Sequence, residues 1–452
     1  MSSNPRTPNL KLAALLDQAE CQRQELARAI NRISTSAGVP LHLTGQAVSN
    51  WVRGSNNPKD QVKPLLLAAL SEKCGRPITH EEAGLTPPAT AEGKQYLDTV
   101  EHLLNLGRAG MDPSRRGVLA AGVFSAALSV PVFGTAAEAH ANEPVLPPGK
   151  STTRIGASQV ASVRRTTGRI ADILDEDGAG HARPMAAAYL VNTVAPWLRA
   201  QAASRVAADV KAAASDLTYL TGWMAMYEKD HAAAQRCYLK ALDLADDAGD
   251  HVTYCRTLRG MSLQMTSLRH GAKGLESADS AAEAAPSAGP RLVAFLRGQQ
   301  AHAASMVKDK RQAHTRLREA EIALSEADNR RDAVGGYDRT AWLFHLSHVL
   351  VEENDLVGSI KALKDSIAVQ PEQERQGRVH SYALLAQRQL ALGHVDASAR
   401  SWGRFLDEYE QVSSARGDDH FDTMRREMWR HQKTYAVREL RERAHEVAAL
   451  KA

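Results

Sequence analysis

Apolar positions in residues 9–85 recur three and four apart, which is the spacing of one face of an α-helix. Capping residues, glycine and proline divide this pattern into short segments. The predicted helices run from Leu10 to Ala19 after an Asn9 cap, from Gln22 to Ser34, from Thr44 to Gly54, from Val62 to Lys73, and over a short stretch after Thr79. The side chains expected to face inward are Leu12, Leu15, Leu16, Leu26, Ala29, Ile30, Ile33, Ala47, Val48, Trp51, Val52, Leu65, Leu66, Ala69 and Leu70. Residues 9–85 are therefore predicted to form a compact helical domain.

The third of these helices has two chemically different faces. Thr44 is expected to cap it through its hydroxyl, and Gly54 followed by Pro58 to end it. Opposite the apolar face lie hydrogen-bonding side chains of the kinds that read base edges or grip phosphates, namely Gln46, Ser49, Asn50 and Arg53. The segment thus predicts the recognition helix of a helix-turn-helix, against the alternative of an ordinary solvated face.

The preceding helix fits this interpretation in part. Ala27 is a small residue where the two helices of such a motif cross closely. The connection Ser-Ala-Gly-Val-Pro-Leu-His-Leu is longer than the turn of the minimal motif, so the turn is expanded. Basic residues nearby are candidates for phosphate contacts, with loose surface charge as the alternative: Arg28, Arg32, Lys59 and Lys63.

Residues 86–153 have the composition of a connector. A short amphipathic helix is predicted near Lys94 to Leu106, and prolines gather near the end of the segment. Between them, Arg115-Arg116 and an apolar alanine-rich run imitate a twin-arginine export signal. The run follows a predicted DNA-binding domain, is shorter than 20 residues and contains glycine and proline, so we interpret residues 115–134 as an apolar linker helix rather than a signal or an anchor. We expect no stable membrane association and a cytoplasmic location.

Residues 154–452 repeat at helix-pair spacing. Small residues near the start of each second helix can be aligned with spacings of 38, 38, 41, 45 and 39, at Pro196, Ala234, Ala272, Ala313, Gly358 and Ala397. Gly222, Ala234 and Tyr238 follow the small-and-large order of a tetratricopeptide (TPR) repeat. Small residues let paired helices nest, so the pattern predicts a TPR-like α-solenoid, with an irregular helical bundle as the alternative. Scarce aromatic and abundant alanine and leucine residues favour an all-α fold throughout.

Candidate chemistry outside the first domain is sparse. The four cysteines form no CxxC pair, which argues against a zinc site or a disulfide framework and fits a reduced compartment. His345 and His348 lie three apart without a carboxylate or cysteine placed to complete a metal site, and residues 246–250 lack the later glutamate of a calcium loop. Phosphate-binding and nucleophile motifs are missing from the sequence. We therefore expect no enzyme activity, no cofactor and no metal.

The net charge of +4 is too small to indicate nucleic-acid binding by itself, but residues 1–90 hold ten basic against seven acidic side chains. A second basic stretch lies near the other end of the chain and is interleaved with glutamates: Arg425, Arg426, Arg430, Lys433, Arg438, Arg441 and Arg443. We interpret it as a helix that caps the solenoid, with contact to DNA or another subunit as the alternative.

Together these features resemble the actinomycete regulators that join an XRE-like helix-turn-helix to a TPR-like domain, and the layout is similar to peptide-sensing regulators of other Gram-positive bacteria. The resemblance is carried by residues 26–32, by Val48-Ser49-Asn50-Trp51-Val52-Arg53-Gly54 with Pro58, and by residues 70–79 and 84–85. It implies transcriptional control, often of development or secondary metabolism.

The resulting hypothesis is a sequence-specific regulator that binds a double-stranded operator as a homodimer. One such motif reads few base pairs, so useful affinity normally takes two half-sites. The repeat domain is expected to bind a peptide, protein or small-molecule effector. The alternative is a TPR-type protein-interaction adaptor without specific DNA binding.

Overall fold

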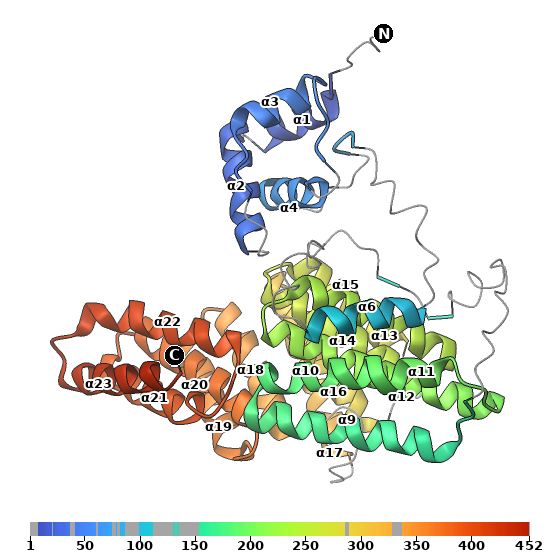
Figure 1. Cartoon of the computed structure of the whole chain (residues 1–452). Coiled ribbons are helices and arrows are strands. Elements are labelled where there is room, and N and C mark those ends of the chain that lie inside the picture. The colour runs from blue at the N-terminus through green and yellow to red at the C-terminus, as the bar shows by residue number, and fades with distance from the viewer. Residues whose placement is uncertain are drawn as a thin grey trace. The chain divides into compact units, whose positions relative to one another are not determined.

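The chain is all-α in the computed structural model, which describes residues 8–19, 21–36, 41–59, 62–74, 78, 82–85, 99–111, 130–131, 133–134, 153–284, 289–327 and 337–451. These residues hold no strand, and one isolated bridge joins Arg154 to Gln201. They divide into two compact units, one of residues 1–129 with 230–235 and the other of residues 130–229 with 236–452. The division falls inside the segment that the sequence identifies as a connector, and each unit is described by itself (Figure 1).

The N-terminal unit contains four short helices around one apolar core, and a further helix whose residues are not part of that core. The four are α1 (Leu10–Gln18), α2 (Arg23–Ser36), α3 (Gly45–Val52) and α4 (Lys63–Cys74), and the further helix is α6 (Thr99–Met111). The side chains predicted to face inward from α1 to α4 lie in this core or pack against it, and Leu12, Leu26 and Ile30 are fully buried. The predicted helix near residues 94–106 is described over Thr99–Met111, as α6, and residues 94–98 lie outside the described part. The helix predicted after Thr79 also lies largely outside it, and residues 82–84 form a turn.

Asn9 closes the N-terminal unit on itself. Its Oδ1 accepts from Leu12 N–H at 2.9 Å, which confirms the predicted cap of α1. Its Nδ2 donates to the carbonyls of Ala83 and Gly84 at 2.9 and 3.1 Å, and its backbone N–H donates to the carbonyl of Val52 at 2.8 Å. One residue therefore ties the start of α1 both to the end of α3 and to the turn at residues 82–84.

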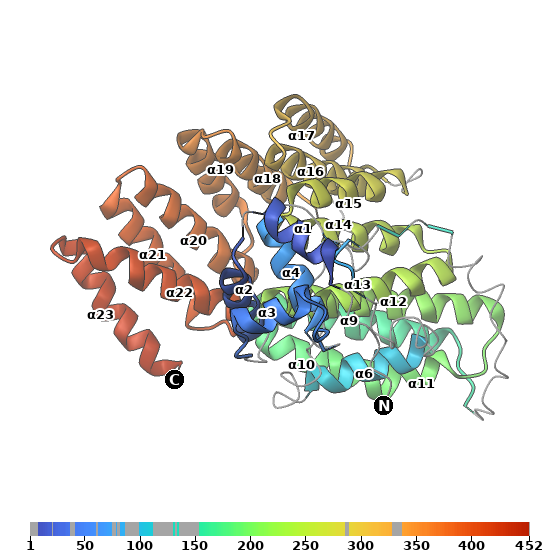
Figure 2. The same cartoon turned by 90° about the horizontal axis from the view of Figure 1, so that it is seen from above.

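The second unit is built from helix pairs that follow one another along the chain (Figure 2). A leading segment holds α9 (Ala157–Asp177), α10 (Ala179–Tyr189), the π-helical η1 (Leu190–Val194) and α11 (Ala195–Leu198). The pairs are α12 (Ser204–Tyr227) with α13 (His231–Ala248), α14 (His251–Ser267) with α15 (Gly271–Glu283), α16 (Pro290–Met306) with α17 (Lys310–Ser325), α18 (Arg339–Glu352) with α19 (Leu356–Val369), α20 (Arg375–Ala391) with α21 (Val395–Tyr409), and α22 (Ala415–Met428) with α23 (Tyr435–Leu450). A 3-10 turn, η2 (Trp429–His431), joins the last two helices. This packing of successive helix pairs confirms the predicted α-solenoid.

The turn inside each of the first five pairs has the same backbone form. One residue with positive φ stands just before the second helix, with spacings of 40, 39, 46 and 39 from one pair to the next, at Lys229, Arg269, Lys308, Asn354 and Gly393. The residue that follows is an aspartate or a histidine, and in three pairs the aspartate accepts from the first turn of the second helix, as Asp309 does from Gln312 N–H at 2.9 Å. The repeat is therefore a property of the backbone and does not depend on a shared residue type.

Four of the small residues used to align the repeats in the sequence are wrong anchors. Ala272 is exposed, Gly358 and Ala397 are half-buried, and Pro196 lies in α11 before the first pair. The buried small positions lie twelve residues apart on the two helices of a pair: Gly222 and Ala234, Ser262 and Gly274, Ala301 and Ala313, Ser347 and Ser359, Ala386 and Ser398. Where one member is serine it bonds across the pair, as Ser262 Oγ does to the Gly274 carbonyl at 2.7 Å. Small size there allows the two helices to nest.

The solenoid returns on itself at one end. Ser413, just before α22, accepts from Gly180 N–H at 2.9 Å, and its own N–H donates to the Asp177 carbonyl at 2.8 Å. Ala415 N–H donates to Glu228 Oε1 at 3.2 Å, across 187 positions of the chain. The leading segment and α12 therefore contact the last pair.

Phe133 is the described part of the connector that lies on this unit. Its ring lies 3.9 Å from the ring of His251 and 4.9 Å from that of Tyr254, and the N–H of Gly134 donates to Asp246 Oδ1 at 2.8 Å. Most of the predicted apolar linker helix at residues 115–134 lies outside the described part. Among the helices that the structure describes, none combines the length and the apolar character needed to span a bilayer.

Candidate nucleic-acid interface

The polar residues predicted on α3 form one hydrogen-bonded group on its outer face. Gln46 Nε2 donates to Asn50 Oδ1 at 3.0 Å, and Arg53 Nη2 donates to the same oxygen at 3.2 Å. Arg53 Nε donates to the backbone carbonyl of Ser49 at 3.2 Å. Within the described residues, Gln46 Oε1, Asn50 Nδ2 and Arg53 Nη1 have no partner, so an acceptor, a donor and a forked cation are held side by side and remain free.

The opposite face of α3 fixes the helix in the core. Val48 is fully buried and Trp51 is 6% exposed, as the periodicity predicts. The helix ends as the sequence predicts too, because Gly54 has φ of 68° and its N–H bonds to the Trp51 carbonyl at 3.2 Å, while Ser55 N–H bonds to the Asn50 carbonyl at 2.9 Å. The helix therefore ends at Val52, with Arg53 as its C-cap and the left-handed Gly54 directly after it.

The N-terminus of α3 is not capped in the predicted way. Thr44 has the extended backbone of an N-cap, but its hydroxyl makes no capping hydrogen bond. Gln24 of α2 acts instead, since its Oε1 accepts from Gly45 N–H at 2.8 Å. A Cβ at Gly45 would lie 3.2 Å from the Gln24 Cα, so the missing side chain lets the two helices approach. Ala27 is fully buried, but the closest approach shown between α2 and α3 is at Gly45.

The long loop before α3 is held at its end by α2. Asn31 Nδ2 donates to the Leu43 carbonyl at 2.8 Å, and Asn31 Oδ1 accepts from Leu43 N–H at 2.8 Å. Ser34 Oγ accepts from Leu41 N–H at 3.0 Å and donates to the Asn31 carbonyl at 2.8 Å. These bonds set where α3 begins, whatever the length of the loop.

The other predicted phosphate contacts differ in exposure. Arg28 and Arg32 are exposed on α2, and Lys59 is exposed after the buried Pro58. Lys63, at the start of α4, is only 9% exposed, so the proposed phosphate contact at this residue is wrong for the fold as it stands.

Arg23 is a further exposed cation beside α3, at a position that the sequence did not single out. It is the first residue of α2, it is exposed, and its Nη1 lies 3.5 Å from Ser49 Oγ. Its position at the start of the helix that precedes α3 is the feature of the sequence that could have indicated it. Ser49 is thus contacted by two arginines, by Arg23 at its hydroxyl and by Arg53 at its backbone carbonyl.

The comparison with protein families gives a match whose ends lie close to those of the domain predicted over residues 9–85. Residues 12–86 match the family model described as the SP15 N-terminal domain. The matched stretch covers the core of the N-terminal unit from Leu12 to Leu85. The comparison with curated proteins finds no match.

The two chemical alternatives named in the sequence have structural explanations. His345 is 3% exposed and its Nδ1 lies 3.0 Å from the Tyr337 hydroxyl, while Asp250 caps α14 by accepting from Val252 and Thr253. Among the described residues, no cluster of three histidine, cysteine or carboxylate side chains has the arrangement of a metal site.

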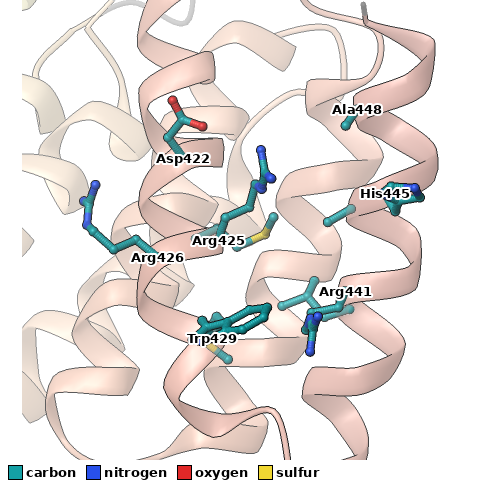
Figure 3. A pocket seen from close by; sticks show the side chains of 11 residues that line it. Asp422, Arg425, Arg426, Trp429, Arg441, His445 and Ala448 are labelled. Atoms are coloured by element: carbon teal, nitrogen blue, oxygen red, sulfur yellow. The ribbon is translucent and has the colours of Figure 1, made fainter.

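The basic stretch near residues 425–443 is two helices, not one. A hollow of about 550 Å³ lies between α22 and α23. Figure 3 shows the side chains that line it. Met424, Met428 and Leu440 form its buried apolar floor, and the Arg441 guanidinium lies 4.5 Å from the centre of the Trp429 ring. The apolar residues of α23, among them Val437 and Val447, are buried in a core cluster that they share with α20, α21 and α22. This packing fits the interpretation of α23 as a helix that caps the solenoid.

Proposed function

We propose that this protein is a sequence-specific DNA-binding regulator whose α3 enters the major groove. The supporting observation is the outer face of α3, where Gln46, Asn50 and Arg53 are linked to each other and keep free hydrogen-bonding atoms. Paired amides and a forked guanidinium match the donor and acceptor pattern of base edges. The buried Trp51 and the Leu43 tether hold that face in a fixed position, which lowers the cost of ordering it on binding.

Around this face, exposed cations support contacts to the phosphate backbone. Arg23 and Lys59 flank α3 in the sequence of the unit, and Arg28 and Arg32 lie on exposed positions of α2. Such contacts orient a protein on the duplex but carry no sequence information. In this proposal the protein acts in the cytoplasm as a homodimer on two half-sites, and the repeat domain binds an effector that adjusts DNA affinity.

The test begins with full-length protein and a random duplex pool, from which bound fragments are selected and sequenced. Affinity for the selected site is then measured by fluorescence anisotropy at several salt concentrations. We expect Asn50→Ala to cost about 1–3 kcal/mol of specific binding and to relax the preference at one base pair. Recovery of no enriched sequence by the wild-type protein would refute specific DNA binding.

Arg53→Lys separates base reading from phosphate binding. Lysine keeps the charge but loses the planar fork. If Arg53 reads a base, Arg53→Lys lowers specificity while the salt dependence is unchanged. If Arg53 holds a phosphate, Arg53→Ala instead lowers the salt slope by about one and weakens all sequences alike. Unchanged affinity and preference in Arg53→Ala and Asn50→Ala would refute the assignment of α3.

The adaptor alternative is favoured by the repeat architecture itself, because stacked helix pairs present extended surfaces to other proteins. Chromatin enrichment separates the two functions. A regulator is recovered with particular genomic fragments, whereas an adaptor is recovered with a protein partner and with DNA at background level.

A further inference from the structure

An arginine without a counter-ion lies buried among the first helices of the repeat domain. Arg259, on α14, is 6% exposed, and its Nε has no hydrogen-bond partner. None of the described residues forms an ion pair with it. Two rings face its guanidinium, that of Phe295 on α16 at 4.1 Å and that of Trp223 on α12 at 5.5 Å.

The groups around Arg259 are polar but uncharged. Burial lowers its pKa, and the side chains that raise the pKa again are the hydroxyls of Tyr219, Tyr337, Tyr238 and Tyr227. The hydroxyl of Tyr238 is itself buried without a partner. The guanidinium remains protonated in proteins, so a full positive charge is kept in these surroundings.

One carboxylate near these helices, that of Glu352, is already paired with other cations. Glu352 is bound by Arg269 and Lys308 at its own edge of the domain. Arg388, on α20, is 7% exposed and donates to Ser347 Oγ at 3.1 Å, and burial lowers its pKa to about 10. Arg259 and Arg388 are therefore two buried cations on the first helices for which the described residues supply no ion pair.

Removing a charge from water without a partner is costly, and ring faces offset only part of that cost. A carboxylate is the group that relieves it best, because it accepts two parallel hydrogen bonds from one guanidinium. The neighbouring rings offer apolar surface beside that position. Trp223 and Tyr227 are half-buried, so solvent still reaches the edge of the cluster.

We propose that Arg259 anchors a binding site for a small organic anion that carries a carboxylate on a flat apolar group. Arg259 pairs with the carboxylate, while the apolar part packs against Trp223 and Phe295, and the Tyr238 hydroxyl supplies a further donor. This proposal rests on the effector-binding role proposed above and names the chemical class of the effector.

The experiment uses full-length protein and matched probes. Naphthalene-2-carboxylate is compared with naphthalene-2-carboxamide by isothermal titration calorimetry and thermal unfolding, in the absence of DNA. Inorganic phosphate and benzoate are titrated in parallel. Phosphate shows how much binding the negative charge gives without apolar surface, and benzoate shows the effect of a smaller ring. We expect the naphthalene carboxylate to raise Tm and to bind at least about tenfold more tightly than its amide, since one charge-assisted bidentate pair distinguishes the two.

Arg259→Met is the decisive variant, and Arg256→Met is its control. Arg256 lies one turn earlier on α14 but is already paired with Asp216 at 2.8 Å. We expect Arg259→Met to lose the preference for carboxylate over amide, and its own Tm to stay equal or rise because an unpaired buried charge is removed. Arg256→Met should keep the preference. If Arg259→Met does not fold, Arg259→Lys serves instead, with a reduced preference expected because the fork is lost.

Equal binding of carboxylate and amide by the wild-type protein overturns the proposal, and so does an unchanged preference in the Arg259 variants. Failure of every anion to bind more tightly than the amide overturns it as well. Because binding is measured without DNA, each of these results leaves the test of Asn50 and Arg53 unaffected.

Discussion

Replacement of Asn31 by alanine is expected to destabilise the N-terminal unit by about 2–3 kcal/mol. Its half-buried amide makes two 2.8 Å hydrogen bonds to the backbone of Leu43. Each such bond contributes a net ~0.5–1.5 kcal/mol, and partners left half-buried without a replacement add to the loss. Both bonds end one residue before Thr44, so the same substitution releases the start of α3 and should weaken specific DNA binding beyond the effect on stability.

The stability can be measured on a fragment of residues 1–90, because the core of this unit is formed by side chains between Leu12 and Leu85. Trp51 is the single tryptophan of that fragment and is buried, so its fluorescence follows urea unfolding directly. Arg28→Ala, on the exposed side of the same helix, is the control and should stay within about 0.5 kcal/mol of wild type. A loss below about 0.5 kcal/mol for Asn31→Ala would show that the loop is positioned by other contacts.

Two further predictions concern the repeat domain. Gly222→Ala places a Cβ 2.9 Å from the Tyr238 ring and should lower the free energy of unfolding in urea by about 1–3 kcal/mol. Gly168→Ala, at an open helical position, is the control and should raise it by up to about 1 kcal/mol. Equal effects of the two substitutions would refute close packing at Gly222. Burial lowers the pKa of His302 to about 4, so the folded state binds fewer protons than the unfolded chain between about pH 6.5 and 4. The stability that neutral His302 contributes to the folded state is fully present above this pH range and is lost as the pH falls through it. The loss in the free energy of unfolding is about 3 kcal/mol at most. His302→Gln should therefore flatten the decline of stability with acid in pH-dependent denaturation, and an unchanged slope would contradict this.

The helices of the N-terminal unit were predictable because each carries its own apolar stripe. Val48 and Trp51 are buried for the reason that the sequence shows, namely their spacing on one face. The group that caps α3 was not predictable. Thr44 stands at the N-cap position and has a suitable hydroxyl, but the Gly45 N–H instead donates to Gln24, which belongs to another helix. The outer face of α3 could be proposed from residue types alone, while the network around Asn50 required the backbone.

In the repeat domain the period was visible, but the register was not. Ala272 and Gly274 are equally small, so composition does not show which one lies between the helices. The turn at Arg269, which has positive φ, fixes where the second helix of the pair begins. The start of that helix then determines which of the two residues faces the first helix. The isolation of Arg259 was beyond sequence analysis altogether, because the absence of a counter-ion depends on helices distant in the chain.

The bond between Glu228 and Ala415 also bears on the order of events during synthesis. A linear repeat array can fold pair by pair as it leaves the ribosome, because each pair needs only its neighbour. Here α12 meets the last pair across 187 positions, so this contact forms only after almost the whole domain has been made. We expect nascent chains stalled before Ser413 to hold folded pairs with an unsealed edge, open to proteases and chaperones until the last pair arrives.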